Sequence, residues 1–168
     1  MNRFKVLLVD DSPQTLKALG GALRNHDYDI ITAESGDMAL EIFRTNAIDL
    51  IITDENMPGL SSTKLLAALK TLYPDVMKIT LTGTSDIEIL KKAINKGEIY
   101  RFFPKPWDDF ELSIAVRQGL QKRFLEKENG KLRRVVNEQS KLLSELEKDF
   151  PGISEMRTTE DGSIIIEG

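Results

Sequence analysis

Side chains capable of chemistry follow directly after several short apolar runs of this sequence. Asp10 and Asp11 come after the first run, and Asp54 comes after the third. Thr82 ends the fourth run, and Lys105 lies just beyond the fifth. Because the chain has no cysteine and a single histidine, a metal held by these carboxylates would be a hard divalent cation, Mg²⁺ above all.

These side chains, brought together, would suit phosphoryl transfer. Three neighbouring carboxylates repel one another unless a cation compensates, and protein-bound Mg²⁺ is commonly completed by phosphate oxygens and water. A carboxylate can also act as a nucleophile and form an aspartyl phosphate. Lys105 offers a positive charge and Thr82 a hydroxyl donor for the phosphoryl oxygens. Each residue alone has an ordinary structural explanation, so the chemistry is indicated by the set.

The elements that must position these residues alternate along the chain. Five short apolar runs predict strands, and the segments after them have helical spacing. These helical segments open at Ser12, Ser35, Ser61, Ser85 and Trp107-Asp108. The runs cover residues 4–9, 29–33, 49–53, 76–82 and 99–103. This α/β pattern predicts a doubly wound, five-stranded parallel sheet of flavodoxin-like order 2-1-3-4-5. The carboxyl ends of strands 1 and 3 are then neighbours, so the three acids should converge there.

Composition narrows the class of protein. The 168 residues are 40% hydrophobic and carry a net charge of −4, which predicts a globular fold and disfavours binding to nucleic acid or anionic membrane. No apolar run approaches the roughly 20 residues that span a bilayer. We therefore expect a soluble, cytoplasmic protein.

The motifs KVLLVDDSP, DLIITDENMPG, ITLTGTSD and YRFFPKPW occur in this order. Together they resemble the receiver domain of two-component response regulators, over residues 3 to about 122. The resemblance implies that Asp54 accepts a phosphoryl group from a histidine kinase or phosphotransfer protein. It also implies that Asp10, Asp11, Asp54 and the backbone carbonyl of Asn56 hold Mg²⁺.

The resemblance assigns further roles at the same edge of the sheet. Thr82 and Lys105 would contact the phosphoryl oxygens, and the Lys105–Pro106 bond would be cis. On activation Thr82 would move toward the phosphoryl group, and Phe102 would turn into the space that it leaves. The signal would then be read from the fourth helix, fifth strand and fifth helix, near Ile94, Tyr100 and Phe102.

Two other functions remain as alternatives. An aspartate-nucleophile phosphatase of the haloacid-dehalogenase type needs a second acid two residues after the nucleophile, and Asn56 occupies that position. The other alternative is a receiver fragment of a larger regulator whose output domain is missing. The leading prediction is a phosphoacceptor signalling domain rather than an enzyme, because the roughly 46 residues after the receiver hold no recognisable output enzyme.

The chain continues past the receiver, and we expect three parts: a receiver at 1–122, a helical extension at 123–150 and a tail at 151–168 with a possible β-hairpin. The extension carries a heptad seam typical of a coiled coil. Its positions are Leu125, Asn129, Leu132, Val136, Gln139, Leu143, Leu146 and Phe150. Self-association as a homodimer is favoured, and docking to an unknown output protein or packing against the chain's own receiver are the alternatives.

Overall fold

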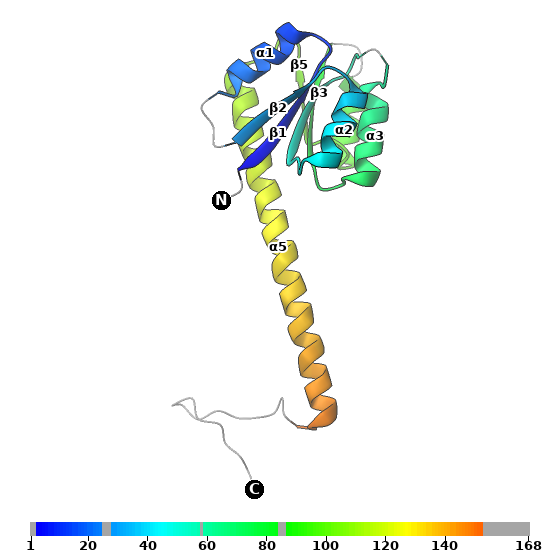
Figure 1. Ribbon diagram of the computed structural model, residues 1–168, viewed down its shortest axis with the longest axis vertical. Coiled ribbons are helices and arrows are strands. Elements are labelled where there is room, and N and C mark those ends of the chain that lie inside the picture. Colours follow the sequence, from blue (N-terminus) through cyan, green and yellow to red (C-terminus); the bar gives the residue numbers. More distant parts are fainter. Residues whose placement is uncertain (1–2, 25–27, 58, 84–86, 153–168) are drawn as a thin grey trace. The chain divides into compact units, whose positions relative to one another are not determined.

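The computed structural model describes residues 3–24, 28–57, 59–83 and 87–152 (Figure 1). Within this part of the chain, five strands alternate with five helices. The strands are β1 (Phe4–Val9), β2 (Tyr28–Ala33), β3 (Leu50–Asp54), β4 (Met77–Thr82) and β5 (Arg101–Pro104). The helices are α1 (Pro13–Ala22), α2 (Gly36–Thr45), α3 (Ser62–Leu72), α4 (Ile87–Asn95) and α5 (Asp109–Asp149).

The sheet has the predicted topology. Its strands are all parallel and lie in the order β2-β1-β3-β4-β5. β1 and β3 are neighbours, and Val9 pairs with Thr53 at the carboxyl end of the two strands. The doubly wound, flavodoxin-like fold is therefore confirmed, with strand boundaries that differ from the predicted ones by two residues at most.

The predicted serine caps open three of the helices. The Oγ atoms of Ser12, Ser35 and Ser61 each accept a hydrogen bond from the backbone N–H three residues later. Such caps satisfy donors that the first helical turn leaves without partners. Trp107 and Asp108 are predicted to open the last helix, and Asp108 does so, because its carboxylate accepts a hydrogen bond from the Glu111 N–H at 2.9 Å. The predicted cap at Ser85 lies outside the described residues.

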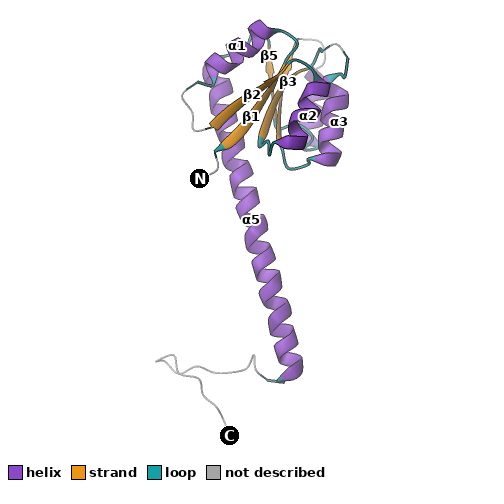
Figure 2. Ribbon diagram, in the orientation of Figure 1, coloured by secondary structure: helices purple, strands orange, loops and turns teal. Residues whose placement is uncertain are grey.

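Helices lie on both faces of the sheet (Figure 2), and two apolar layers hold them there. On one face, Val6, Leu8, Leu50 and Ile79 pack with α1 and with the first turns of α5, where Leu112, Ala115, Val116 and Leu120 are buried. On the other face, Leu7, Val9 and Ile51 pack with α2 and α3. Both faces of the sheet are thus covered, as expected for a parallel sheet.

β4 is unusual because one side of it is polar and buried. Lys78, Thr80 and Thr82 alternate with Met77, Ile79 and Leu81, and all six residues are buried. The Lys78 ammonium donates to the Val76 carbonyl at 3.0 Å. Burial lowers the pKa of Lys78, an effect that nearby Asp75 opposes and nearby Arg123 reinforces.

The first compact unit covers Met1–Phe124, and the second begins at Leu125, within α5. The predicted long C-terminal helix is present, since α5 runs without interruption for 41 residues. In this single chain the seam residues Leu125, Leu132, Val136, Leu143 and Phe150 are all exposed. The predicted β-hairpin in the tail lies outside the described residues. None of the helices in the described segments is long and apolar enough to cross a membrane.

Candidate functional site at the carboxyl edge of the sheet

Three carboxylates meet where β1 and β3 end. Asp10 and Asp11 follow β1, Asp54 is the last residue of β3, and one oxygen from each lies within 4.8 Å of the others. The pairing of Val9 with Thr53 brings these positions side by side. The structure therefore brings together the three acids that the sequence places at this edge.

Asp10 is the most deeply buried of the three, with 1% of its surface exposed. Its Oδ1 accepts a hydrogen bond from the Ser12 N–H at 2.8 Å, at the start of α1. Its Oδ2 accepts from the Lys105 ammonium at 3.1 Å. Burying a charged group is unfavourable unless partners of this kind compensate. The Asp10 carboxylate is thus fixed in place, whereas Asp11 is exposed.

Lys105 links the two buried carboxylates. Its Nζ lies 2.9 Å from Asp54 Oδ2 and 3.1 Å from Asp10 Oδ2. The Lys105 backbone N–H donates to the Thr82 carbonyl at 2.9 Å, and the Lys105–Pro106 peptide bond is cis. Burial lowers the pKa of Lys105, but its hydrogen bonds to Asp54 and Asp10 outweigh burial and leave the pKa raised. The Lys105 side chain therefore stays positively charged at this site.

Asp54 is buried but has a path to solvent. Its Oδ2 contacts Lys105, and its Oδ1 accepts a hydrogen bond from the Asn56 N–H at 3.3 Å. The side chain of Asp54 is 10% exposed, and Asn56 beside it is exposed. A reagent can therefore approach this carboxylate from the edge of the sheet.

Thr82 has a partner that the sequence did not suggest. Its hydroxyl donates to Glu55 Oε2 at 2.5 Å, while the Glu55 backbone N–H donates to the Leu81 carbonyl at 3.0 Å. Glu55 directly follows Asp54, and strand alternation would point consecutive side chains to opposite faces. β3 ends at Asp54, so that rule no longer applies to Glu55. The acidic type of Glu55, next to a candidate acceptor, was the one available signal.

The predicted switch aromatic, Phe102, lies on the edge strand β5. It is partly buried and pairs with Thr80 of β4. Tyr100, which packs against the core, has the cations of Arg101 and Lys122 over its ring at 5.4 and 5.7 Å. The structure places Phe102 near the strand that carries Thr82, and its role in switching stays a prediction.

The acidic cluster fits the predicted metal by its donor chemistry. Among the described residues, Asp10, Asp11 and Asp54 are the set of acids that lie close enough to share one ion. Oxygen donors of this kind suit Mg²⁺, and three carboxylates exceed the single positive charge of Lys105. The excess negative charge favours binding of a cation.

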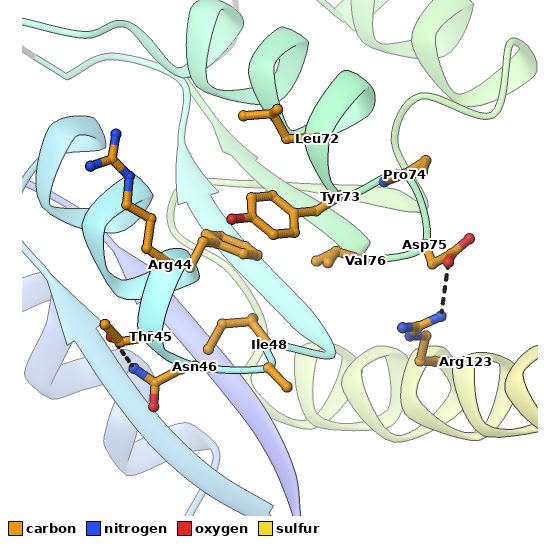
Figure 3. Close-up of a pocket in the computed structure, with 12 residues that line it drawn as sticks. Arg44, Thr45, Asn46, Ile48, Leu72, Tyr73, Pro74, Asp75, Val76 and Arg123 are labelled. Carbon is orange, nitrogen blue, oxygen red and sulfur yellow. Dashed lines mark hydrogen bonds and ion pairs between the residues drawn. The ribbon is translucent and has the colours of Figure 1, made fainter.

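A separate pocket of about 520 Å³ lies at the amino ends of β3 and β4, away from the acids at the carboxyl ends. Figure 3 shows the residues that line it. It is formed around the loops that precede β3 and β4, where Phe43 and Tyr73 pack with ring centroids 4.9 Å apart. Arg123 and Asp75 form an ion pair at 3.8 Å on its border. None of the predicted site residues lines this pocket.

Comparisons with known proteins agree with this geometry. Residues 6–117 match the family model described as the response regulator receiver domain. The transcriptional regulatory protein GlrR of Escherichia coli is 34% identical over 116 residues, which cover 69% of this chain and 26% of GlrR. A cyclic di-GMP phosphodiesterase of Thermotoga maritima is 29% identical over 118 residues, which cover 70% of this chain and 31% of that protein.

The solved structures show the same likeness. The signal receiver domain of an HD domain-containing protein from Pseudomonas fluorescens is 37% identical, with a TM-score of 0.68, and the match covers 73% of this chain and 98% of that domain. The chain spans only about a quarter of the length of the first curated relatives it matches. The match of the family model over residues 6–117 shows that the chain belongs to the response regulator receiver domain family.

Proposed function

We propose that Asp54 accepts a phosphoryl group and that residues 1–122 form the receiver that carries it. The observation that supports this most strongly is the position of the Asp54 carboxylate, which keeps 10% of its side chain exposed at the edge of the sheet and lies 2.9 Å from the Lys105 ammonium. Asp10 is buried more deeply, with 1% of its surface exposed against 7% for Asp54. Asp54 is therefore the buried acid best placed to react.

Charge compensation is the main contribution of this chain to the transfer. Addition of a phosphoryl group to Asp54 introduces negative charge beside Asp10 and Asp11. Lys105 already lies between Asp54 and Asp10, so its ammonium can contact the new oxygens without a large movement. The Thr82 hydroxyl, at the end of the neighbouring strand β4, is the second donor. Catalysis of this kind depends mostly on positioning and electrostatic stabilisation.

The metal site in this proposal consists of Asp10, Asp11, Asp54 and the backbone carbonyl of Asn56. A bound Mg²⁺ supplies positive charge that stabilises the charge developing on the phosphoryl oxygens. The chain's own part is to hold the Asp10 carboxylate with the Ser12 N–H and to keep Asp11 accessible. Removal of divalent cations should therefore prevent phosphorylation and leave the fold intact.

Response regulator receivers take their phosphoryl groups from histidine kinases or phosphotransfer proteins, and we propose a partner of this class here. Acetyl phosphate tests the acceptor without knowledge of that partner. Intact mass should show Mg²⁺-dependent addition of one phosphoryl group to the wild-type chain and no addition to Asp54→Asn. Asp75→Asn is the matched control, since Asp75 is exposed and lies before β4, at the other end of the sheet. Labelling of Asp54→Asn to the wild-type level would overturn the assignment.

A signalling domain and a phosphatase differ in turnover. A receiver assists only its own phosphorylation and dephosphorylation, so p-nitrophenyl phosphate with Mg²⁺ should give no sustained hydrolysis. The family match favours the receiver over the haloacid-dehalogenase alternative. Many turnovers per chain, lost in Asp54→Asn, would favour the phosphatase instead.

For the output, we propose that residues 123–150 form a homodimeric coiled coil. The supporting observations are the 3–4 spacing of the seam and its exposure, with Leu132, Val136 and Leu143 each more than half exposed in this single chain. Apolar residues at these positions gain stability when a second helix covers them. Asn129 at an a position would fix a parallel register.

Two neighbouring substitutions test the dimer. Leu143→Asp puts a charge in the seam and should shift the mass measured by light scattering toward the monomer. Ser144→Asp adds the same charge one residue outside the seam and should leave the mass unchanged. Equal effects of both, or a monomeric mass for the wild-type chain at high concentration, would contradict the coiled coil. Signal output would then pass to a partner protein or further domain, as the greater length of the relatives also suggests.

A further inference from the structure

Glu55 holds the hydroxyl that the phosphoryl group is proposed to use. Thr82 is 1% exposed, and its Oγ1 donates to Glu55 Oε2 at 2.5 Å. The Glu55 backbone is itself anchored, because its N–H donates to the Leu81 carbonyl at 3.0 Å. Hydrogen bonds to a charged acceptor are roughly twice as strong as neutral ones. The bond therefore commits the hydroxyl proton of Thr82 to Glu55.

A threonine hydroxyl has only one proton to donate. Thr82 cannot donate to Glu55 and to an oxygen on phosphorylated Asp54 at the same time. We propose that Glu55 is a positioning residue that competes with the phosphoryl group for Thr82 and so stabilises the unphosphorylated state. This inference rests on the proposed function, because it assumes that the phosphoryl group is carried by Asp54.

The charge of Glu55 acts in the same direction as its hydrogen bond. Glu55 adjoins Asp54, so a phosphoryl group there would meet a further carboxylate in addition to Asp10 and Asp11. Like charges in one site raise the free energy of the state that holds both. Glu55 is only half-buried and can turn into solvent once Thr82 is released. The phosphorylated state is thus reached only when the Thr82–Glu55 bond breaks.

Beryllofluoride, which mimics a phosphoryl group on a carboxylate, is the probe. With Mg²⁺ at saturation, Glu55→Ala should bind beryllofluoride about tenfold more tightly than the wild-type chain, which corresponds to about 1.4 kcal/mol. Glu55→Gln keeps an oxygen acceptor without the charge, and its gain should be intermediate. Glu34→Ala removes an exposed acid just after β2, at the same edge of the sheet, and should change the affinity less than twofold, about 0.4 kcal/mol.

A double-mutant cycle separates the hydrogen bond from the charge. In a Thr82→Ala background the hydrogen bond to Glu55 no longer exists, so Glu55→Ala should lose most of its gain in beryllofluoride affinity. An equal gain in both backgrounds would overturn the competition for Thr82. A ligand-free readout is the NMR shift of the Thr82 methyl group, which Glu55→Ala should move toward its beryllofluoride-bound value. No movement of that signal would also overturn the proposal.

These outcomes distinguish the role of Glu55 from the proposed phosphorylation of Asp54 on which it rests. If beryllofluoride fails to bind the wild-type chain, the proposed phosphoacceptor is wrong and the role of Glu55 fails with it. If beryllofluoride binds and Glu55→Ala binds no more tightly, Asp54 stands and Glu55 has no part in the switch. Urea unfolding of each variant checks that the fold is kept. Glu55→Gln, which preserves the shape of the side chain, replaces Glu55→Ala in the comparison if that variant unfolds.

Discussion

Lys105→Met should destabilise the receiver when no divalent cation is present, because Asp10 and Asp54 would lose the ammonium between them. The two Nζ–Oδ2 distances are 3.1 and 2.9 Å. At about 3 Å, the attraction of one such pair is about 1.4 kcal/mol with water-like screening and about 5.5 kcal/mol at an effective dielectric constant of about 20. Lys105 keeps 30% of its side chain exposed, so solvent offsets part of this energy.

The expected net loss in the free energy of unfolding is therefore about 1.5–3 kcal/mol, the range measured for hydrogen bonds to charged groups. Urea unfolding in EDTA gives the free energy of unfolding directly. Saturating Mg²⁺ should restore more stability to Lys105→Met than it adds to the wild-type chain, since the cluster then regains a cation. Lys70→Met is the control, because the ion pair of Lys70 with Glu98 is exposed, and its loss should cost less stability than Lys105→Met. Equal stability of Lys105→Met and wild type in EDTA would refute this reasoning.

Two further comparisons of variants test the scaffold by urea unfolding. Gly36→Ala should lower the free energy of unfolding by about 1–3 kcal/mol, because a Cβ there would lie 2.8 Å from the Leu60 carbonyl oxygen. Gly20→Ala, whose Cβ would have nothing within 4 Å, should raise it by up to about 1 kcal/mol. Equal effects of the two substitutions would contradict the tight approach at Gly36. Because burial lowers the pKa of Lys78 in the folded state, its ammonium opposes folding below that pKa, and the penalty fades as the pH rises toward the unfolded value of 10.5. The free energy of unfolding of the wild-type chain should thus rise relative to that of Lys78→Met as the pH rises toward 10.5. A difference that stays constant over this rise would show that Lys78 carries no such penalty.

The fold and the meeting of the acids could be predicted from sequence because both follow from simple geometry. Alternating strands and helices specify a parallel sheet, and the carboxyl ends of its strands share one edge. Residues directly after strands 1 and 3, such as Asp10 and Asp54, therefore had to be neighbours. Lys105 reached the same edge for the same reason.

The partner of Thr82 could not be predicted in this way. Glu55 lies just beyond the last residue of β3, where strand alternation gives no direction for a side chain. The burial of Lys78 could not be predicted either, because the apolar run 76–82 predicts a strand without showing which side of it a helix covers. The seam of α5 raises a different difficulty, since a single chain cannot show what covers Leu132 and Leu143.

The central claim is that Asp54 is the residue that carries the phosphoryl group. Borohydride reduces an acyl phosphate on aspartate to homoserine, which peptide mass mapping can place in the chain. After treatment with acetyl phosphate and Mg²⁺, we predict homoserine at position 54 and unmodified Asp10 and Asp11. Reduction at Asp10 or Asp11 with Asp54 intact would contradict the account.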